Sequence, residues 1–401
     1  MQRPIVNRTV VGNFAELEAV DPLFARLYAA RGVTSPDQLD YGLAGLLPIS
    51  SLEHIDDAVN LLLKHRDERI IVVGDFDVDG ATSTALMLRC LRAFDFADVG
   101  YLVPNRFEFG YGLSPEIVQV AAERSPQLII TVDNGISSLA GVRAAKDAGI
   151  NVLVTDHHLP AEELPAADVI VNPNLPDSHF ASRNLAGVGV AFYLMAALGR
   201  ALQDSGATGA GKIPARYLDL VALGTVADVV PLDHNNRILV QQGLNRMRAG
   251  HTVAGIQALL TQAGRQVARV VSSDLGFAVG PRINAAGRLE DMSVGIECLL
   301  TDDHTVAAQH AALLDEINKE RRDIEATMRE QAFTYVDSLD SRKWPACVCV
   351  YEESWHQGVV GLIAARVREK THRPVIAFAR ESEGLLKGSA RSVAGVHARD
   401  L

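Results

Sequence analysis

The chain has 401 residues, a length at which two or three domains are expected rather than one. Hydrophobic residues make up 48% and charged residues 22%, as is usual for a soluble globular protein, and no apolar run is long enough to predict a membrane span. The net charge of −11 argues against a broad nucleic-acid-binding coat, although carboxylates gathered in a metal site would contribute to it. Four scattered cysteines without a CxxC pair, and an N-terminus without an apolar signal segment, predict a reduced, cytoplasmic protein.

Short apolar runs alternate with helical patterns between residues 69 and 173. This alternation predicts parallel βαβ units, and so an α/β fold. The expected strands are residues 70–75, 99–104, 128–135, 151–158 and 167–173. Residues 1–45, which precede this region, carry helix and turn patterns but no evident chemistry.

The second half of the chain begins with helical patterns and returns to α/β alternation. Residues 187–202 and a block over 214–300 read as helical, and 304–338 form one long helical pattern with Leu314, Ile317, Ile324 and Met328 on one face. Beyond it we expect a strand at 346–353, a helix at 358–370 and a strand at 373–380. The predicted domains are an N-terminal segment (1–45), a parallel-sheet domain (46–303), a connecting helix (304–338) and a second, incomplete α/β domain (339–401).

Carboxylates and imidazoles follow three of the expected strands. They are Asp75, Asp77 and Asp79 after the first, Asp133 after the third, and Asp156, His157 and His158 after the fourth. The carboxyl ends of parallel strands open into one crevice, so these groups should lie together. Such a cluster of acids would repel without a cation. Aspartate oxygens with a histidine nitrogen suit Mn²⁺ or Mg²⁺, and the lack of nearby cysteine argues against structural zinc.

Each motif taken alone has a simpler explanation. The first three acids could point to one side of a continuing strand, or Gly80 could let the chain turn, and solvated acids are common in turns. The EF-hand alternative fails, because the twelfth loop position has no glutamate and a strand precedes the run. Asp133 could be a helix cap, and Asp156-His157-His158 could lie on the surface. Their coincidence at three equivalent strand ends favours the metal site.

The expected chemistry follows from these groups. Asp228 is a further candidate ligand, since an acid within the apolar segment GTVADVVPL needs a partner or a metal. A two-metal site hydrolyses phosphodiesters well, and Asp133, from the middle strand, is the candidate bridging ligand. A histidine that does not bind metal could hold the phosphate or protonate the leaving oxygen.

Three segments offer contacts to a nucleic-acid substrate. They are NRFEFGYGLS with Arg106, Phe107 and Tyr111, PRINAAGR with Arg282, Asn284 and Arg288, and KGSARS with Ser389 and Arg391. Arginines bind phosphates, and aromatic faces stack on unpaired bases. The alternatives are a packed aromatic turn for the first segment and structural ion pairs for the second. We expect the second segment, PRINAAGR, to be a loop of small residues. The third could capture a terminal phosphate.

The segments GDFDVDGATS, TVDNGISS, TDHHLP and GTVADVVPL resemble the successive motifs of the DHH phosphoesterase superfamily. Together with GPRINAAGRLEDMSVGIECLL, HQGVVGLIAARV and KGSARSV, they resemble the RecJ family of single-strand-specific exonucleases over residues 45–401. The resemblance implies a DHH domain, a long connecting helix and a DHHA1-like domain. It also implies 5′-to-3′ degradation of single-stranded DNA with Mn²⁺ or Mg²⁺ in recombination and repair, with a single-strand-binding protein or a helicase as partner.

The resemblance also implies roles for single residues. The implied metal ligands are Asp77, Asp79, Asp133, His157 and Asp228. Asp75 and His158 would lie beside them, with His158 near the scissile phosphate and Asp156 orienting a histidine, while Arg106, Ser389 and Arg391 would form a 5′-phosphate pocket. Relatives with two well-occupied metals often have a histidine where this chain has Gly74, which leaves the number of ions at one or two. The family's Gly-Gly-His motif and OB-fold are missing before Leu401, so a truncated chain is expected.

Three rival functions remain. A phosphodiesterase for short oligonucleotides or dinucleotides is favoured by the missing OB-fold, whereas the long central region and GPRINAAGR favour the exonuclease. An inorganic pyrophosphatase would need a dense cluster of lysine and arginine that we do not find. A non-catalytic replication scaffold should have lost the metal ligands that this chain keeps. The sequence therefore predicts the exonuclease.

Overall fold

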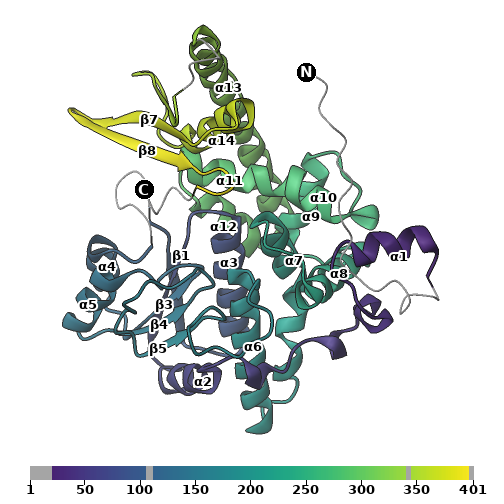
Figure 1. Cartoon of the computed structure of the whole chain (residues 1–401). Helices are drawn as coiled ribbons and strands as arrows, with labels where there is room; N and C mark the ends of the chain where they lie inside the picture. Colours follow the sequence, from purple (N-terminus) through teal and green to yellow (C-terminus); the bar gives the residue numbers. More distant parts are fainter. Residues whose placement is uncertain (1–19, 105–111, 340–344, 397–401) are drawn as a thin grey trace.

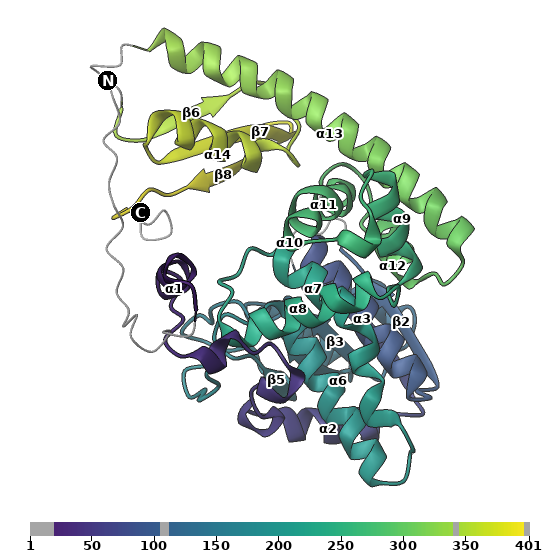
Figure 2. The ribbon, with the colours of Figure 1, turned by 90° about the vertical axis from the view of Figure 1, so that its right-hand side faces the viewer.

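The computed structural model describes residues 20–104, 112–339 and 345–396. Two α/β parts lie on either side of a large helical block, and one long helix, α13 (His304–Ser338), runs along the block to the second part (Figures 1 and 2). A short helix, α1 (Pro22–Ala29), precedes the first part. Among the described residues no helix is both long and apolar enough to span a membrane. Arg106, Phe107 and Tyr111 lie outside the described residues.

The first part is built on a five-stranded, all-parallel sheet. Its strands are β1 (Arg69–Gly74), β2 (Asp98–Leu102), β3 (Leu128–Val132), β4 (Asn151–Thr155) and β5 (Val169–Val171), in the order β2-β1-β3-β4-β5. The register aligns Gly74 with Val132, and Val132 with Thr155. Each of these residues is the last of its strand, so the acids that follow leave the sheet at one shared edge. The expected parallel sheet is thus confirmed.

Helices cover both faces of this sheet, as its apolar strands require. On one face lie α2 (Ile55–Lys64), α3 (Val78–Ala93) and α6 (Gly187–Asp204), and on the other α4 (Pro115–Ala122) and α5 (Leu139–Asp147). Successive residues of a strand alternate between two buried clusters: Ile70 and Val72 pack toward α3 and α6, while Ile71 and Val73 pack toward α4 and α5. This alternation follows from the two-residue period of a strand.

The helical block lies beside the sheet, against α3. It contains α7 (Leu218–Ala227), α8 (His234–Arg248), α9 (Ala254–Gln262), α10 (Ser272–Asp274), the π-helix η8 (Leu275–Val279), α11 (Gly280–Leu289) and α12 (Ser293–Leu300). The loop expected over residues 281–288 is wrong, because these residues form α11. Pro281 stands shortly after the π-helical turn η8, within one continuous helical run over residues 272–289.

The long helix α13 joins two separate hydrophobic cores. Its residues agree with the expected span 304–338, and Asp303 caps its first turn by accepting from Thr305 N at 2.7 Å. Ala311 and Leu314 belong to the core of the sheet part, whereas Met328 and Val336 belong to that of the C-terminal part. This single helix therefore links the sheet part to the C-terminal part.

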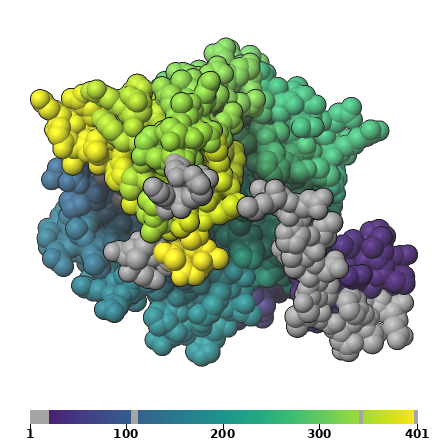
Figure 3. All heavy atoms as spheres, turned by 45° about the horizontal axis from the view of Figure 1, so that its top comes forward, coloured from purple at the N-terminus to yellow at the C-terminus, as the bar shows by residue number. Residues whose placement is uncertain are grey.

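The C-terminal part has a three-stranded sheet with one packed helix. The elements are β6 (Val348–Tyr351), α14 (Val360–Thr371), β7 (Val375–Ser382) and β8 (Leu385–Arg391). Strands β6 and β7 are parallel, and β7 and β8 are antiparallel. The sequence did not predict β8, which carries the KGSARS segment. The part packs over the rest of the chain (Figure 3), where a Cβ on Gly358 would stand 1.9 Å from the backbone oxygen of Arg288. Only glycine allows so close an approach.

Candidate metal centre and phosphate pocket

The acidic loop after β1 turns as soon as the strand ends. Asp77 caps helix α3 by accepting a hydrogen bond from Gly80 N at 3.0 Å, and Asp79 lies in the first turn of that helix. A Cβ on Gly80 would meet the backbone oxygen of Asp75 at 2.3 Å, so the turn needs glycine. Of the two alternatives from the sequence, the turn is therefore correct. The helix N-terminus, with its partial positive charge, lies beneath these acids.

Asp79 is held by the N-terminus of a second helix, α6. Its two carboxylate oxygens accept hydrogen bonds from Gly187 N at 2.7 Å and Val188 N at 2.9 Å. A Cβ on Gly187 would stand 2.7 Å from Asp133 Oδ1, so this glycine lets α6 approach two acids at once. This support was not predicted from the sequence. The available signal was the glycine that opens the helix, at residue 187.

His157 lies where three acids meet. Its Nε2 is 3.1 Å from Asp133 Oδ1, 3.6 Å from Asp228 Oδ2 and 3.8 Å from Asp79 Oδ2. Asp133 has a φ of 61°, a left-handed conformation that aspartate tolerates and that turns the chain out of β3. Asp228 comes from the C-terminal end of α7. Four segments far apart in the sequence thus bring their polar atoms to one point.

Asp156 lies beside this cluster and orients its histidines. It accepts hydrogen bonds from Ile136 N at 2.9 Å, from His157 N at 2.7 Å and from His158, through N at 3.1 Å and Nδ1 at 2.8 Å. Burial acts to raise the pKa of Asp156, but the hydrogen bonds from His158 and from the backbone outweigh it and hold that pKa below its ordinary value. With its lone pairs committed, Asp156 positions His158 rather than offering itself to an ion.

Potential metal ligands form three overlapping groups in the part of the chain that the structure describes. They are Asp79, His157 and Asp228; Asp75, Asp77 and Asp133; and Asp133, His157 and His158, each with ligand atoms within 4.8 Å of one another. Asp133 Oδ1 and His157 Nε2 are buried and have no hydrogen-bond partner. Buried polar atoms are rarely left in that state, so the donor set fits divalent cations. The first two groups share no residue, which leaves room for two ions.

The pKa values of the acids in the cluster also indicate a cation site. Burial, followed by the charge of Asp77, raises the pKa of Asp75 to about 7 and that of Asp228 to about 6. Burial and neighbouring carboxylates raise the pKa values of Asp79 and Asp133 well above the ordinary value. Acids that resist ionisation in this way are stabilised when a cation replaces their protons.

The two histidines differ in charge. Burial and the neighbouring His158 lower the pKa of His157 to about 4, so its imidazole is neutral and free to coordinate. The hydrogen bond to Asp156 raises the pKa of His158 to about 9, against the opposing effect of burial. The rings lie 4.5 Å apart, and the His158 side chain is 56% exposed. His158 is therefore a cation on the open side of the cluster.

The surroundings of Gly74 leave no room for a histidine at this position. A Cβ on Gly74 would stand 2.2 Å from Thr84 Oγ1, on the helix that packs behind the strand. The ligands available to a second ion are therefore those of the following loop, Asp75 and Asp77, together with Asp133.

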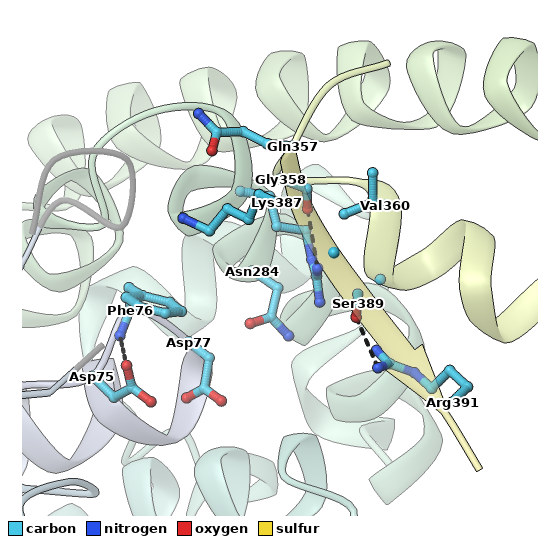
Figure 4. A pocket seen from close by; sticks show the side chains of 13 residues that line it. Asp75, Phe76, Asp77, Asn284, Gln357, Gly358, Val360, Lys387, Ser389 and Arg391 are labelled. Atoms are coloured by element: carbon cyan, nitrogen blue, oxygen red, sulfur yellow. Dashed lines mark hydrogen bonds between the residues drawn. The ribbon is translucent and has the colours of Figure 1, made fainter. Parts of the chain in front are cut away.

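A pocket of about 270 Å³ opens between the acidic loop and the C-terminal sheet (Figure 4). Its lining residues are Asp75, Phe76, Asp77, Asn284, Arg288, Gln357, Gly358, Val360, Gly361, Lys387, Gly388, Ser389 and Arg391. Arg391 Nη1 donates to Ser389 Oγ at 3.0 Å, and Arg288 Nη1 donates to the backbone oxygen of Gly358 at 3.3 Å. Cations on one wall and carboxylates on the other suit an anion that also contacts metal.

Some of the predicted substrate contacts line the pocket, and one does not. Asn284, Arg288, Ser389 and Arg391 line the pocket, whereas Arg282 does not. Arg282 is buried, with its guanidinium 2.8 Å from Asp315 Oδ1 of α13. Its prediction as a substrate contact is wrong, and the structural ion pair considered as the alternative is correct. Lys387 and Gln357, which the sequence analysis did not select, complete the lining. Lys387 stands in the KGSARS segment, two residues before Ser389, which was the available signal.

Comparisons with known proteins agree with this geometry. The N-terminal domain of the DHH family matches residues 69–225, and the DHHA1 domain matches residues 345–401. The single-stranded-DNA-specific exonuclease RecJ of Escherichia coli K12 is 53% identical over 98% of this chain and 70% of its own length. The exonuclease of the same name from Bacillus subtilis is 34% identical over 98% of this chain and 49% of its own length.

Solved structures show the same fold with metal bound. A crystal structure of exonuclease RecJ bound to manganese has a TM-score of 0.76 and 35% identity, and covers 88% of this chain and 86% of its own. RecJ of Thermus thermophilus in complex with Mn²⁺ has a TM-score of 0.81 and 34% identity, and covers 96% of this chain and 54% of its own. The same protein with Mg²⁺ has a TM-score of 0.74.

Proposed function

The chain belongs to the RecJ family of single-stranded-DNA-specific exonucleases, and on this premise we propose how its residues divide the work of hydrolysis. It is a metal-dependent hydrolase of phosphodiester bonds in single-stranded DNA. The observation that carries the assignment of roles is that Asp75 and Asp77 of the acid and histidine cluster line one pocket together with the cations of β8.

Mn²⁺ or Mg²⁺ is the cofactor, as in the solved structures of the family. We propose that Asp79, His157 and Asp228 hold one ion and that Asp75 and Asp77 hold a second, with Asp133 close enough to serve both. When bound, such ions lower the pKa of water and neutralise charge on the scissile phosphate. Asp79 itself is held in place by the amides of α6.

His158 is the proposed proton donor. Its Nδ1 is fixed by Asp156 at 2.8 Å, so the other ring nitrogen is left for the substrate. With its pKa raised to about 9, the ring carries a proton at neutral pH and can hold the scissile phosphate or protonate the leaving oxygen. Asp156 acts through this histidine as a positioning residue.

The proposed 5′-to-3′ polarity rests on the pocket. We propose that Ser389 and Arg391 bind the 5′-terminal phosphate, with Arg288 and Lys387 beside them and Asn284 orienting the loop through its bond with Val78 N at 3.2 Å. Arginine forms short, directional bonds with phosphate oxygens. A strand anchored there places the adjoining phosphodiester over Asp75 and Asp77, so cleavage proceeds from the 5′ end. Arg106, Phe107 and Tyr111 remain proposed contacts outside the described residues.

The remaining proposals concern organisation and setting. We propose domain limits at residues 46–303 for the DHH domain, 304–338 for the connecting helix and 339–401 for the DHHA1-like domain, after an N-terminal segment over 1–45. A role in recombination and repair fits the family. We propose the cytoplasm as its location, and a single-strand-binding protein or a helicase as the partner that presents the DNA.

One product analysis tests this function. The substrate is a 5′-phosphorylated single strand labelled at its 3′ end, incubated with Mn²⁺ beside a duplex and a linear dinucleotide, with Asp133→Asn as the blank. We expect a ladder that shortens from the 5′ end on the single strand alone. Cleavage of the dinucleotide alone would move the assignment to a phosphodiesterase for short substrates. Complete inactivity of freshly metal-loaded protein would contradict the proposal.

A further inference from the structure

An exposed phenylalanine stands on a π-helical turn. Phe277 is 85% exposed, more than any other large hydrophobic side chain among the described residues. It lies in the π-helix η8 (Leu275–Val279), between α10 and α11. π-Helical turns are rare and occur frequently at functional sites. The aromatic face of Phe277 is open to a ligand that approaches from solvent.

The π-helix packs against residues that flank the metal ligands. A Cβ on Gly276 would be 3.3 Å from Val226 Cγ1, and one on Gly280 would be 3.4 Å from the Cβ of Ala227 and 4.0 Å from Val78 Cγ2. Val226 and Ala227 lead directly into Asp228, and Val78 stands between Asp77 and Asp79. Figure 2 shows α10 and α11, which bracket η8, between α7 and the C-terminal sheet. The turn that carries Phe277 therefore packs against residues that flank the ligands.

A second apolar residue is exposed at the same edge. Val229, which follows Asp228, is 83% exposed and has a φ of 64°. A β-branched residue in this left-handed region is strained, and such strain clusters at sites where a ligand is bound. Val229 thus reaches solvent beside a metal ligand for reasons unrelated to η8. The two observations are independent: Val229 directly follows the ligand Asp228, and the turn that carries Phe277 packs against the residues that lead into this ligand.

We propose that Phe277, together with Val229, forms the surface on which unpaired bases of the DNA stack as the strand enters the metal centre. The inference rests on the proposed function and names a specificity residue for it. Aromatic side chains stack on any base, because every base has a π-face, and so they bind single strands without regard to sequence. A base within a duplex is already stacked on both sides. Phe277 therefore favours single strands over duplexes within a few nucleotides of the scissile bond.

The first test compares Phe277→Ala with Phe277→Trp on a 5′-phosphorylated oligothymidylate. Loss of one base–aromatic stack should raise KM by roughly 5- to 100-fold in the alanine variant, with a much smaller change in kcat. The tryptophan variant should retain the low KM. Tyr335→Ala is the matched control, since Tyr335 is an aromatic residue, 50% exposed, on the distant helix α13. An equal loss in this control would overturn the proposal.

The second test identifies the stacked base. Single abasic nucleotides are moved along the strand, and KM is measured at each position for the wild type and for Phe277→Ala. In the wild type, one position near the 5′ end should show a raised KM, and the alanine variant should not respond at that position. Identical profiles in the two proteins, with equal melting temperatures, would overturn the inference while leaving the exonuclease intact. A wild type that cleaves no single strand would instead refute the proposed function.

Discussion

The sheet domain and the C-terminal part contribute to one site in opposite ways. The sheet domain buries its acids and fixes them with backbone amides, so that Asp79 and Asp156 each accept at least two such bonds. The C-terminal part presents Ser389 and Arg391 on β8, a strand at the edge of a small sheet. Ligands for a metal must be rigid, whereas a contact for a terminal phosphate need only be within reach. The difference suggests that chemistry resides in the first part and choice of substrate in the second.

The largest expected effect comes from Asp133→Asn, which removes a carboxylate from the acidic cluster of the sheet domain. The amide has the same shape but cannot serve as an anionic ligand, so kcat should fall by about three orders of magnitude or more. Steady-state hydrolysis of single-stranded DNA and calorimetric titration with Mn²⁺ measure the loss. Asp323→Asn, at an exposed position of α13, is the control and should behave as the wild type. Near-normal turnover in Asp133→Asn would remove this residue from the ligand set.

Arg391→Ala removes a cation that the C-terminal part contributes to the pocket. It should change the preference for a 5′-phosphorylated strand more than it changes kcat. The wild type should prefer a 5′-phosphorylated strand to a 5′-hydroxyl strand, and the variant should lose about ten- to a hundredfold of that preference, the expected value of one or two charge-assisted hydrogen bonds. Competition between the two labelled strands measures the ratio. Arg380→Ala is the control, because Arg380 pairs with Glu353 on the same sheet and does not line the pocket. If both variants keep the preference, the 5′ phosphate binds elsewhere.

Arg282→Met should affect stability instead of catalysis. The substitution keeps an unbranched side chain but leaves Asp315 with only Lys319 at 2.8 Å and Gln262 at 3.4 Å as partners. Since one buried charge loses its main partner, we expect a loss of about 2 kcal/mol in the free energy of unfolding. Urea denaturation measures it, with kcat and KM for DNA as the companion readout. A raised KM at unchanged stability would return Arg282 to the substrate contacts.

The contrast between the two parts also explains what the sequence could predict. Buried parallel strands leave continuous apolar runs, and their ends carry the chemistry, so Asp75, Asp133 and Asp156 were found in register. Helix α13 was found with its full length because its apolar face repeats regularly. Strand β8 was missed, because it lies at the edge of an exposed sheet and its alternating residues include glycine and lysine. Edge strands depend on pairing with a neighbour rather than on burial.

Arg282 and Gly187 show a different limit. An arginine in a segment of small residues looks the same in the sequence whether it meets a phosphate or Asp315, which lies 33 residues further along the chain. Likewise the support that Gly187 N gives to Asp79 joins residues 108 positions apart. Both outcomes depend on tertiary packing, which the local pattern does not contain.

The smallest expected effect, a shift of a few degrees in melting temperature, tests the charge balance of the sheet domain. Among the groups that bind protons more tightly in the folded protein are Asp75, whose pKa is raised to about 7, and His158, whose pKa is raised to about 9. Without metal, the folded state therefore holds more protons than the unfolded state between about pH 6.5 and pH 9, and stability should fall as pH rises through this window. With Mn²⁺ the trend should reverse, because the ion binds the deprotonated carboxylates. Melting temperatures in EDTA and in Mn²⁺ from pH 6 to pH 9 measure both slopes. His158→Gln is the informative variant: its metal-free curve should be flatter above pH 7, and an unchanged slope there would show that His158 does not carry the extra proton.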